Sequence, residues 1–310
     1  MQLDMVKTTV RWRGGWLVAA LVGSLLAGCA SAPGPIPHVE ASAPPVVIAK
    51  RPPRVGLALG GGAARGFAHV GVIQVLEEAG IRPDLVVGTS AGSLVAAIYA
   101  SGKGGAQLQQ VADGMEEAML TDWTLPLFRR GVLRGDALAR YVNTQVGGAV
   151  IEAMGIPLGI VATDLHSGEG ILFRRGDTGT AVRASSAVPS LFEPVRIGAR
   201  EYVDGGLVAP VPVRYARQMG AELVIAVDIS NGPETNAADG ALQVVLQAFA
   251  IMGKSINVFE LRDADVVVRP ALGTVHGADF ASRRRSIEAG RTAMLAALPQ
   301  YRARLASLTR

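Results

Sequence analysis

The sequence predicts an α/β fold with a mainly parallel central sheet covered by helices. Short apolar runs of strand length alternate with longer segments in which apolar residues recur at helical spacing, from residue 55 to the end of the chain. A glycine-rich loop, residues 60–66, follows the first apolar run, and Gly88-Thr89-Ser90-Ala91-Gly92 follows the second. Strand, tight turn and helix in direct succession are typical of parallel sheets, whose strands are joined through helices.

The elements follow from these patterns in chain order. Apolar runs predict strands at residues 55–59, 84–88, 158–163, 170–173, 201–204, 223–228 and 264–269. Helical periodicity, interrupted by glycine and proline, predicts helices at residues 67–78, 91–101, 105–120, 136–147, 178–188, 213–219, 242–259 and 286–308. We find no internal repeat, so residues 54–310 are expected to form one α/β domain.

Composition excludes several classes of protein. The chain of 310 residues is 49% hydrophobic and 18% charged, as globular proteins are. Aromatic residues make up 5%, too few to indicate base-stacking surfaces, and half of the formal net charge of +4 lies in residues 1–28. We therefore expect no nucleic-acid partner. With a single cysteine, an intrachain disulfide and a cysteine-based metal site are excluded, and no metal or cofactor is expected.

Residues 1–28 resemble a lipoprotein signal peptide. Lys7, Arg11 and Arg13 precede an apolar run of 12 residues, which is too short for a transmembrane helix and fits a signal segment. The run ends in Leu26-Ala27-Gly28-Cys29, which resembles the lipobox of bacterial lipoproteins and implies cleavage before Cys29 and acylation of its thiol and amine. A cleaved ordinary signal with an incidental cysteine is the alternative. By resemblance to enterobacterial sorting, Ala30 favours the outer membrane, so we expect a lipid-anchored protein of a Gram-negative cell envelope.

Residues 29–53 are expected to form an extended tether. Seven prolines and no hydrophobic periodicity indicate a chain without a core of its own. At ~3 Å per residue, such a segment could hold the domain tens of ångströms from a membrane.

The pentapeptide around Ser90 predicts a nucleophile. The form G-x-S-x-G between a strand and a helix is typical of a sharp turn that exposes a serine hydroxyl. Gly88 and Gly92 allow the chain to bend there without side-chain clashes. A small-residue turn with no catalytic role is the alternative.

Three interpretations of the glycine loop compete. A dinucleotide fingerprint starting at Gly60 would need glycine where Arg65 stands, and a phosphate-binding P-loop ending at Gly66 would need lysine where Phe67 stands. The third is an oxyanion hole, in which backbone amides at a helix N-terminus bind a developing negative oxygen. This interpretation fits best, because parallel neighbouring strands would bring the loop and Ser90 to the same sheet edge.

A serine nucleophile needs a base, and none of the four histidines lies in a sequence context typical of a catalytic base. His38 lies in the tether, His69 in the first helix, and His166 and His276 in polar stretches. A carboxylate is the better candidate: Asp204-Gly205-Gly206 ends a strand on a turn stiffened by the prolines that follow. A turn-capping aspartate is the alternative.

Together these motifs resemble the patatin-like phospholipases. G-G-G-x-x-R-G at 60–66, G-T-S-A-G at 88–92 and D-G-G at 204–206 occur in the order of that family, and residues 183–189 resemble its A-S-x-x-x-P block. The resemblance implies a three-layer α/β/α fold and a dyad without histidine, with Ser90 as nucleophile and Asp204 as base. It places the oxyanion hole at the amides of Gly61, Gly62 and Ala63, and identifies Arg65 as the family's arginine. The supporting motif residues are Gly60, Gly66, Gly88, Gly92, Gly205 and Gly206.

The expected function is that of a serine lipid acyl hydrolase, similar to phospholipase A or lysophospholipase, acting through an acyl-enzyme on phospholipid or another acyl ester. Two alternatives stay open: an esterase or thioesterase acting on soluble short acyl esters, and a non-catalytic envelope scaffold. Helix 242–259 is apolar enough to be a lid or a membrane-facing element, but packing against the sheet is the favoured expectation.

Overall fold

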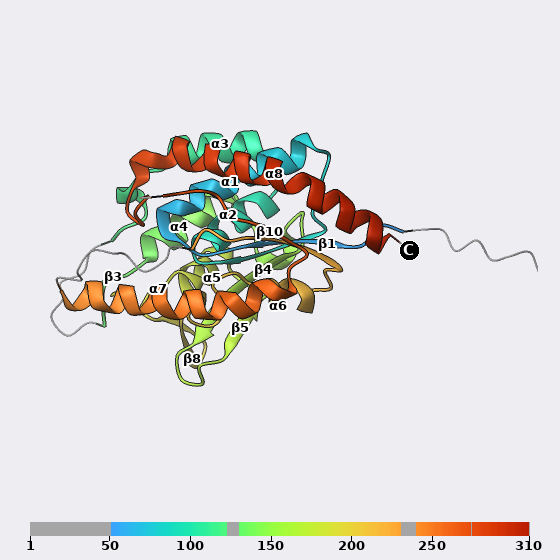
Figure 1. The fold of residues 1–310 in the computed structure, drawn as a ribbon. Helices are drawn as coiled ribbons and strands as arrows, with labels where there is room; N and C mark the ends of the chain where they lie inside the picture. Colours follow the sequence, from blue (N-terminus) through green and yellow to red (C-terminus); the bar gives the residue numbers. More distant parts are fainter. Residues whose placement is uncertain (1–50, 123–129, 231–239, 274, 310) are drawn as a thin grey trace, which may run out of the picture. The chain divides into compact units, whose positions relative to one another are not determined.

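The computed structural model describes residues 51–122, 130–230, 240–273 and 275–309, which belong to one compact unit (Figure 1). The predicted signal peptide, Cys29 and the tether up to residue 50 lie outside the described residues. The folded part begins earlier than residue 54, where the sequence places its start. Arg51 donates two hydrogen bonds of 2.8 Å to the carboxylate of Glu222, and Pro53 is buried.

The central sheet contains eight strands of the described chain. In the order of the sequence they are β1 (Val55–Leu59), β2 (Leu85–Thr89), β4 (Leu158–Asp164), β5 (Gly170–Phe173), β7 (Val195–Ile197), β8 (Arg200–Asp204), β9 (Leu223–Val227) and β10 (Val266–Val268). Their spatial order is β10-β9-β1-β2-β4-β8-β7, with β5 also paired to β4. A separate small sheet pairs β3 (Gly131–Leu133) with β6 (Ser190–Phe192), and the sequence does not predict it.

The first five strands of this order are parallel to one another, and β5, β7 and β8 add antiparallel pairs at one side. The predicted α/β class with a mainly parallel sheet is therefore confirmed. Every residue of β1, β2, β4 and β9 is buried. Strands covered on both faces read as near-continuous apolar runs, which explains why the sequence reveals them.

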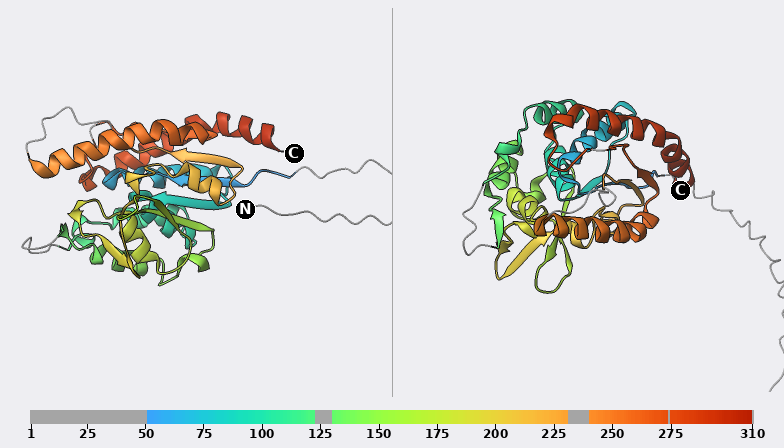
Figure 2. Two further views of the ribbon diagram at one scale, coloured as in Figure 1. Left: turned by 90° about the horizontal axis from the view of Figure 1, so that it is seen from below. Right: turned by 60° about the vertical axis from the view of Figure 1, so that its left-hand side comes forward.

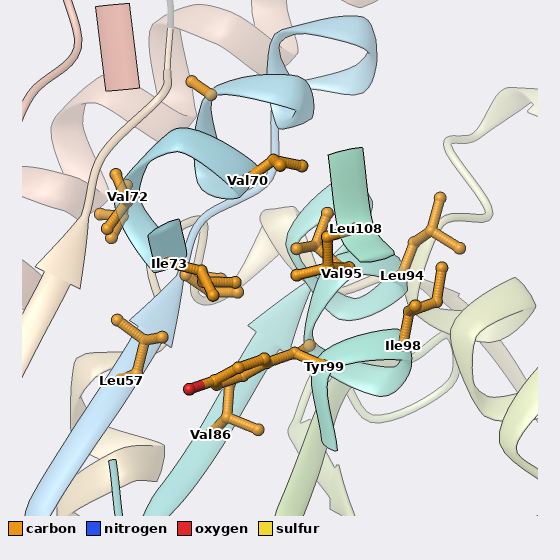
Figure 3. Packing of buried hydrophobic residues seen from close by; sticks show 14 of the residues in the cluster. Leu57, Val70, Val72, Ile73, Val86, Leu94, Val95, Ile98, Tyr99 and Leu108 are labelled. Atoms are coloured by element: carbon orange, nitrogen blue, oxygen red, sulfur yellow. The ribbon is translucent and has the colours of Figure 1, made fainter. Parts of the chain in front are cut away.

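Alternate strand residues face two different cores. Leu57, Val86 and Ile160 lie in one apolar cluster, whereas their neighbours Ala58 and Val87 lie in a second. Because successive side chains of a strand point to opposite faces, the sheet is the middle layer of three. Figure 3 shows the first cluster from close by, with Tyr99 beside Val86 and Leu57 below Ile73.

Helices cover both faces of the sheet. They are α1 (Phe67–Glu78), α2 (Ala91–Ala100), α3 (Gly105–Asp113), α4 (Asp136–Gln145), α5 (Thr178–Ser185), α6 (Val213–Gln218), α7 (Ala241–Glu260) and α8 (Arg283–Leu308). Figure 1 and the right-hand view in Figure 2 show α1, α3 and α8 on one side of the sheet and α7 on the other. The helix predicted at 105–120 ends at Asp113, because Gly114 follows as its C-cap and a separate 3-10 turn, Glu117–Met119, comes next.

Three strands meet along β4 in an arrangement that positions the site. β5 pairs with residues Ile160 to Thr163 of β4, so it occupies one edge of that strand. The other edge is shared: β2 pairs up to Thr89 opposite Val161, and β8 pairs from Asp204 opposite Ala162. Since β2 is parallel to β4 and β8 is antiparallel to it, the carboxyl ends of β2 and β8 meet head to head.

Candidate active site

Ser90 lies in a strained turn directly between β2 and α2. Its φ is 52° and its ψ is −124°, a conformation that residues with a side chain seldom adopt. A Cβ on Gly88 would overlap the backbone of Gly92, and one on Gly92 would overlap the carbonyl of Leu59. Both glycines are thus required by close backbone approach, as the pentapeptide predicts, and the turn lifts the Ser90 side chain out at the sheet edge.

Asp204 ends β8 beside this turn. Its carboxylate accepts a hydrogen bond of 2.6 Å from the amide of Gly206, and its backbone carbonyl accepts one of 2.8 Å from the Thr163 hydroxyl. Gly205 must lack a side chain, because a Cβ there would overlap the carbonyl of Val161. Backbone contacts therefore hold the carboxylate without a third side chain of the kind that orients a catalytic histidine.

The carboxyl group of Asp204 has an unusual environment. The residue is 3% exposed, and burial raises its pKa to about 6, while hydrogen bonds from the Gly206 amide and the Ser90 hydroxyl act in the opposite direction. The Ser90 hydroxyl thus lies near enough to the Asp204 carboxylate to influence its pKa, and both residues line the same cavity. A carboxylate with a raised pKa can accept a proton near neutral pH more readily than an ordinary aspartate.

Ser185 is a further residue of the site, and sequence reasoning did not single it out. Its hydroxyl accepts a hydrogen bond of 2.8 Å from the Ser90 amide and donates one of 2.5 Å to the carbonyl of Val161. It therefore fixes the turn to β4. The signal was present in the A-S-x-x-x-P block at residues 183–189, whose serine this is.

The glycine loop passes next to Ser90 and leads into α1 through the 3-10 turn Ala63–Gly66. A Cβ on Gly61 would lie 3.1 Å from the Cβ of Ser90, so the loop backbone is close to the nucleophile candidate. The sequence predicts an oxyanion hole of three amides, those of Gly61, Gly62 and Ala63, and in the structure one of the three is already occupied. The amide of Gly61 donates to the carbonyl of Pro210 at 2.9 Å, whereas those of Gly62 and Ala63 have no acceptor among the described residues.

The other predicted motif residues support this geometry. Gly60 donates its amide to Val227 at 3.0 Å. A Cβ on Gly66 would come within 2.9 Å of Ala91 at the start of α2, and Arg65 lines the cavity described below. These contacts hold the loop against both β9 and α2.

None of the described histidines lines the cavity into which Ser90 opens, which is described below. His69 is fully buried in α1, where its Nε2 lies 2.8 Å from the carbonyl of Gly60, and burial lowers its pKa to about 4. It is thus a neutral residue that holds the glycine loop. His166 lies in the turn after β4, and neither it nor His276 lines the cavity. His38 lies outside the described residues.

Ser90 and Asp204 open into an apolar cavity of about 690 Å³. Its walls combine the glycine loop with apolar side chains from α1, α2, α3 and α4, among them Val70, Leu94, Ile98, Leu108 and Leu138. Figure 3 shows Leu94 and Ile98 on the same side of α2, with Val95, Leu108 and Val70 grouped nearby. Ser90 and Ile98 are eight residues apart, so the cavity extends ~12 Å along the helix.

Helix α7 closes another side of this cavity. Leu246, Phe249, Ala250 and Gly253 line it, as does Lys254. The favoured expectation of a helix packed on the sheet is thereby wrong: α7 contacts the turn after β8 and the β6 strand, and six of its large apolar side chains stay exposed. Hydrophobic periodicity reveals an apolar helix but not what covers it.

Within the described residues, no group of three or more His, Cys, Asp or Glu side chains has the arrangement of a metal site.

The fold and the site together define an α/β protein with a serine elbow, a neighbouring aspartate and a glycine loop at one edge of the sheet. The comparison with known families is decisive: the sequence model of the patatin-like phospholipases matches residues 57–217. The chain belongs to the patatin-like phospholipase family, and the resemblance found in the motifs is confirmed.

Individual relatives agree with this assignment. An uncharacterised NTE family protein of Mycobacterium tuberculosis is 36% identical over 189 residues, which cover 61% of this chain and 52% of the relative. Patatin-like phospholipase domain-containing protein 6 of Mus musculus is 34% identical over 192 residues, covering 59% of this chain and 14% of the relative. The chain therefore spans at most about half the length of these two relatives.

Among solved structures, VipD from Legionella pneumophila has a similar fold. The TM-score is 0.54 at 17% sequence identity, with 81% of this chain and 67% of VipD covered. At this identity the likeness concerns the fold alone.

Proposed function

We propose that this protein is a serine-dependent lipid acyl hydrolase in which Ser90 is the nucleophile and Asp204 the general base. The observation that carries the proposal is the buried carboxylate of Asp204 beside the Ser90 hydroxyl, with both residues lining an apolar cavity. Membership of the patatin-like phospholipase family supports the same class of reaction.

The proposed reaction has two steps. Asp204 accepts the hydroxyl proton while Ser90 Oγ attacks the ester carbonyl, and the amides of Gly62 and Ala63 stabilise the tetrahedral oxyanion. The intermediate collapses to an acyl-enzyme as the ester C–O bond breaks, and the proton held by Asp204 passes to the leaving alcohol. Asp204 then accepts a proton from water, whose oxygen attacks the acyl carbonyl, and the fatty acid leaves as Ser90 regains its proton.

The cavity favours a substrate with a long acyl chain. Its lining is mostly apolar, and the wall formed by α2 extends beyond the reach of a short acyl group. Burial of each methylene is worth ~0.8 kcal/mol, so a fatty acyl chain would be bound far more tightly than acetyl or butyryl groups. Phospholipids and lysophospholipids combine such a chain with a hydrolysable ester.

We also propose that the protein is an envelope lipoprotein, anchored through acylated Cys29 and placed at the outer membrane of a Gram-negative cell. The supporting observation is the position of the chain's single cysteine after Leu26-Ala27-Gly28. Two or more acyl chains would anchor a protein stably, unlike one. Replacement of Cys29 by serine should abolish incorporation of labelled fatty acid, and labelling that persists would refute the assignment.

The catalytic proposal is tested by substitution of both proposed groups. Ser90→Ala and Asp204→Asn should each lower fatty-acid release from phospholipid vesicles by roughly 10⁴-fold or more, with an unchanged far-UV circular dichroism spectrum. The double variant should be no slower than Ser90→Ala, because groups that act as a unit are not additive. Turnover that survives in Ser90→Ala would overturn the mechanism.

Comparison of p-nitrophenyl ester hydrolysis with fatty-acid release from vesicles separates the lipid hydrolase from the soluble esterase and the scaffold. Chain-length profiles on p-nitrophenyl esters should rise toward long acyl chains for the wild type. A preference for acetyl or butyryl esters with no release from vesicles would instead identify a soluble esterase, and inactivity on every ester would favour a scaffold.

A further inference from the structure

Helix α7 has two apolar faces, and only one of them is covered. Ten large hydrophobic side chains are exposed among the described residues, and six of these lie on α7. Val244, Ile251, Met252, Val258 and Phe259 are 46–65% exposed, and none of the five lines the cavity. At 100° per residue these five positions fall on one side of the helix. We call them the outer face of α7.

The opposite side of α7 is bound to the protein. Leu246, Phe249, Ala250 and Gly253 line the cavity of Ser90. Asn257 accepts a hydrogen bond from the Val211 amide at 3.2 Å, and the Glu260 carboxylate pairs with Arg214 at 2.8 Å. The inner face is thus fixed by polar and apolar contacts, so the outer face points away from the site.

By length and composition, residues Gln243–Asp263 could cross a membrane. Because the inner face is committed to buried polar contacts, a spanning arrangement would require these to break. A helix that keeps one face on the protein and offers an uncharged apolar stripe on the other is suited to lie in the plane of a membrane surface.

We propose that the outer face of α7 docks on a lipid bilayer and brings the cavity mouth to the membrane surface. Charge supports a lipid partner. Glu260 is the single acidic side chain within α7, and it lies on the inner face in its ion pair. The exposed cations at this helix are Lys254, on the cavity side, and Arg262, whose guanidinium lies 5.0 Å from the centre of the Phe259 ring. Cations beside an apolar stripe favour anionic lipid headgroups.

Area argues against a second copy of the chain. A stripe of 20 residues is ~30 Å long, and with a width of ~10 Å it offers ~300 Å². A stable protein interface buries ~800 Å² per partner, more than twice this amount. Insertion into a bilayer has no such requirement, because the stripe needs only to reach the acyl boundary.

The test relies on the chain having a single natural cysteine, because replacing Cys29 leaves an introduced cysteine as the only site for a thiol-reactive label. In full-length protein carrying Cys29→Ser and Ser90→Ala, a cysteine is introduced by Phe259→Cys or Met252→Cys and labelled with an environment-sensitive fluorophore. The matched control is Leu295→Cys, since Leu295 is 51% exposed and belongs to α8, a helix on the other side of the sheet (Figure 1). Vesicles of phosphatidylcholine and phosphatidylglycerol are the probe, and Ser90→Ala keeps them intact.

We expect the fluorescence of labels at 259 and 252 to rise roughly twofold or more on addition of vesicles, with a blue shift, and the label at 295 to stay unchanged. Equal responses at all three positions, or no response at 259 and 252, would overturn the proposal. A blue shift without vesicles, together with a dimer in light scattering, would assign the face to a second copy instead.

A second measurement keeps the proposal separate from the catalytic one. The double substitution Ile251→Glu with Phe259→Glu, on an otherwise active chain, should lower fatty-acid release from vesicles by roughly tenfold and leave hydrolysis of a soluble short ester unchanged. If both activities fall together, or neither changes, α7 does not act at the membrane. The labelling experiment does not depend on enzymatic activity. It therefore tests membrane docking even if the catalytic proposal fails.

Discussion

The backbone amide of Ser90 and the hydroxyl of Ser185 are joined by a hydrogen bond of 2.8 Å, although 95 residues separate them in the chain. The same hydroxyl donates to Val161 in β4. One small side chain therefore satisfies two backbone groups, one buried and one partly buried, and it ties a turn with unfavourable dihedral angles to the strand beside which Asp204 also lies.

Replacement of Ser185 by alanine should weaken both the fold and the site. Leaving the Ser90 amide and the Val161 carbonyl without their partner is expected to lower the free energy of unfolding by about 1–3 kcal/mol. Because the turn at Ser90 would no longer be held against β4, the nucleophile should be less well positioned, so kcat should fall by a larger factor than KM changes. Ser101→Ala, which removes one hydroxyl bond at the end of α2, is the control and should cost less than about 1 kcal/mol. Equal effects of the two substitutions on kcat would contradict this role.

The rate of hydrolysis should depend on the protonation of Asp204. Burial raises the pKa of this carboxyl to about 6, and only the ionised form can accept the Ser90 proton. In the free enzyme, kcat/KM for a soluble ester should therefore increase with pH through about 6 and reach a plateau above it. A profile that rises near pH 4, as for an ordinary aspartate, would show that the base is not a desolvated carboxylate.

The raised pKa of Asp204 also has a consequence for stability. Between about pH 4 and pH 6 the folded protein binds the Asp204 proton more tightly than the unfolded chain, so this group lowers stability as pH rises. His69 acts in the opposite sense, because burial lowers its pKa from 6.5 to about 4 and stability from this group increases with pH. Their opposition should flatten the pH dependence of the wild type in this range.

Asp204→Asn should separate the two effects. The free energy of unfolding of the variant minus that of the wild type should rise with pH across this window and level off above about pH 6. Chemical denaturation at several pH values measures this difference directly. A difference that is constant with pH would mean that Asp204 titrates alike in the folded and unfolded states.

Gly92→Ala should disrupt the nucleophile turn. The added Cβ would overlap the carbonyl of Leu59, a backbone atom that cannot move without distortion of β1. We expect a loss of stability of roughly 3 kcal/mol or more, and loss of hydrolysis in any folded fraction. Gly114→Ala is the matched control, since its nearest neighbour would be 3.6 Å away, and it should change the melting temperature little.

Ile98 should influence which acyl chains are accepted. It lies on α2 about two turns beyond Ser90, is 1% exposed, and lines the cavity. Ile98→Phe should fill this end and shift the preferred p-nitrophenyl ester to a shorter chain, whereas Ile98→Ala should extend it. Both substitutions also perturb the core, so a change in chain-length preference is informative only if the two variants shift it in opposite directions. Parallel shifts would show that acyl chains do not reach this end of the cavity.

The sequence predicted those parts of the site that are encoded by neighbouring residues. The turn at Ser90 and the glycine loop each need special backbone geometry within a few positions, and glycine marks such geometry directly. Asp204 could be found because its own glycines adjoin it. Ser185 was not singled out, because its role depends on a hydrogen bond between segments far apart in the chain.

Two other features required the tertiary structure. The amide of Gly61 is occupied by the carbonyl of Pro210, which no local pattern reveals. The exposure of α7 was likewise not predictable, because the hydrophobic periodicity of a helix is the same whether its apolar side chains are buried or exposed. The strand predicted at 201–204 is present as β8, but its antiparallel direction and the neighbouring strand β7 were not predicted, because short strands carry little pattern of their own.

The head-to-head meeting of β2 and β8 along β4 has a consequence for how the protein matures. The two proposed reactive groups, Ser90 and Asp204, are 114 positions apart in the sequence, and the pair is not assembled until both strands have joined the same edge of β4. Contacts of such long sequence separation form late, because the intervening loops must close first. A chain that is only partly folded would thus be harmless to surrounding lipids. During refolding, the onset of hydrolysis should coincide with the completion of this last pairing.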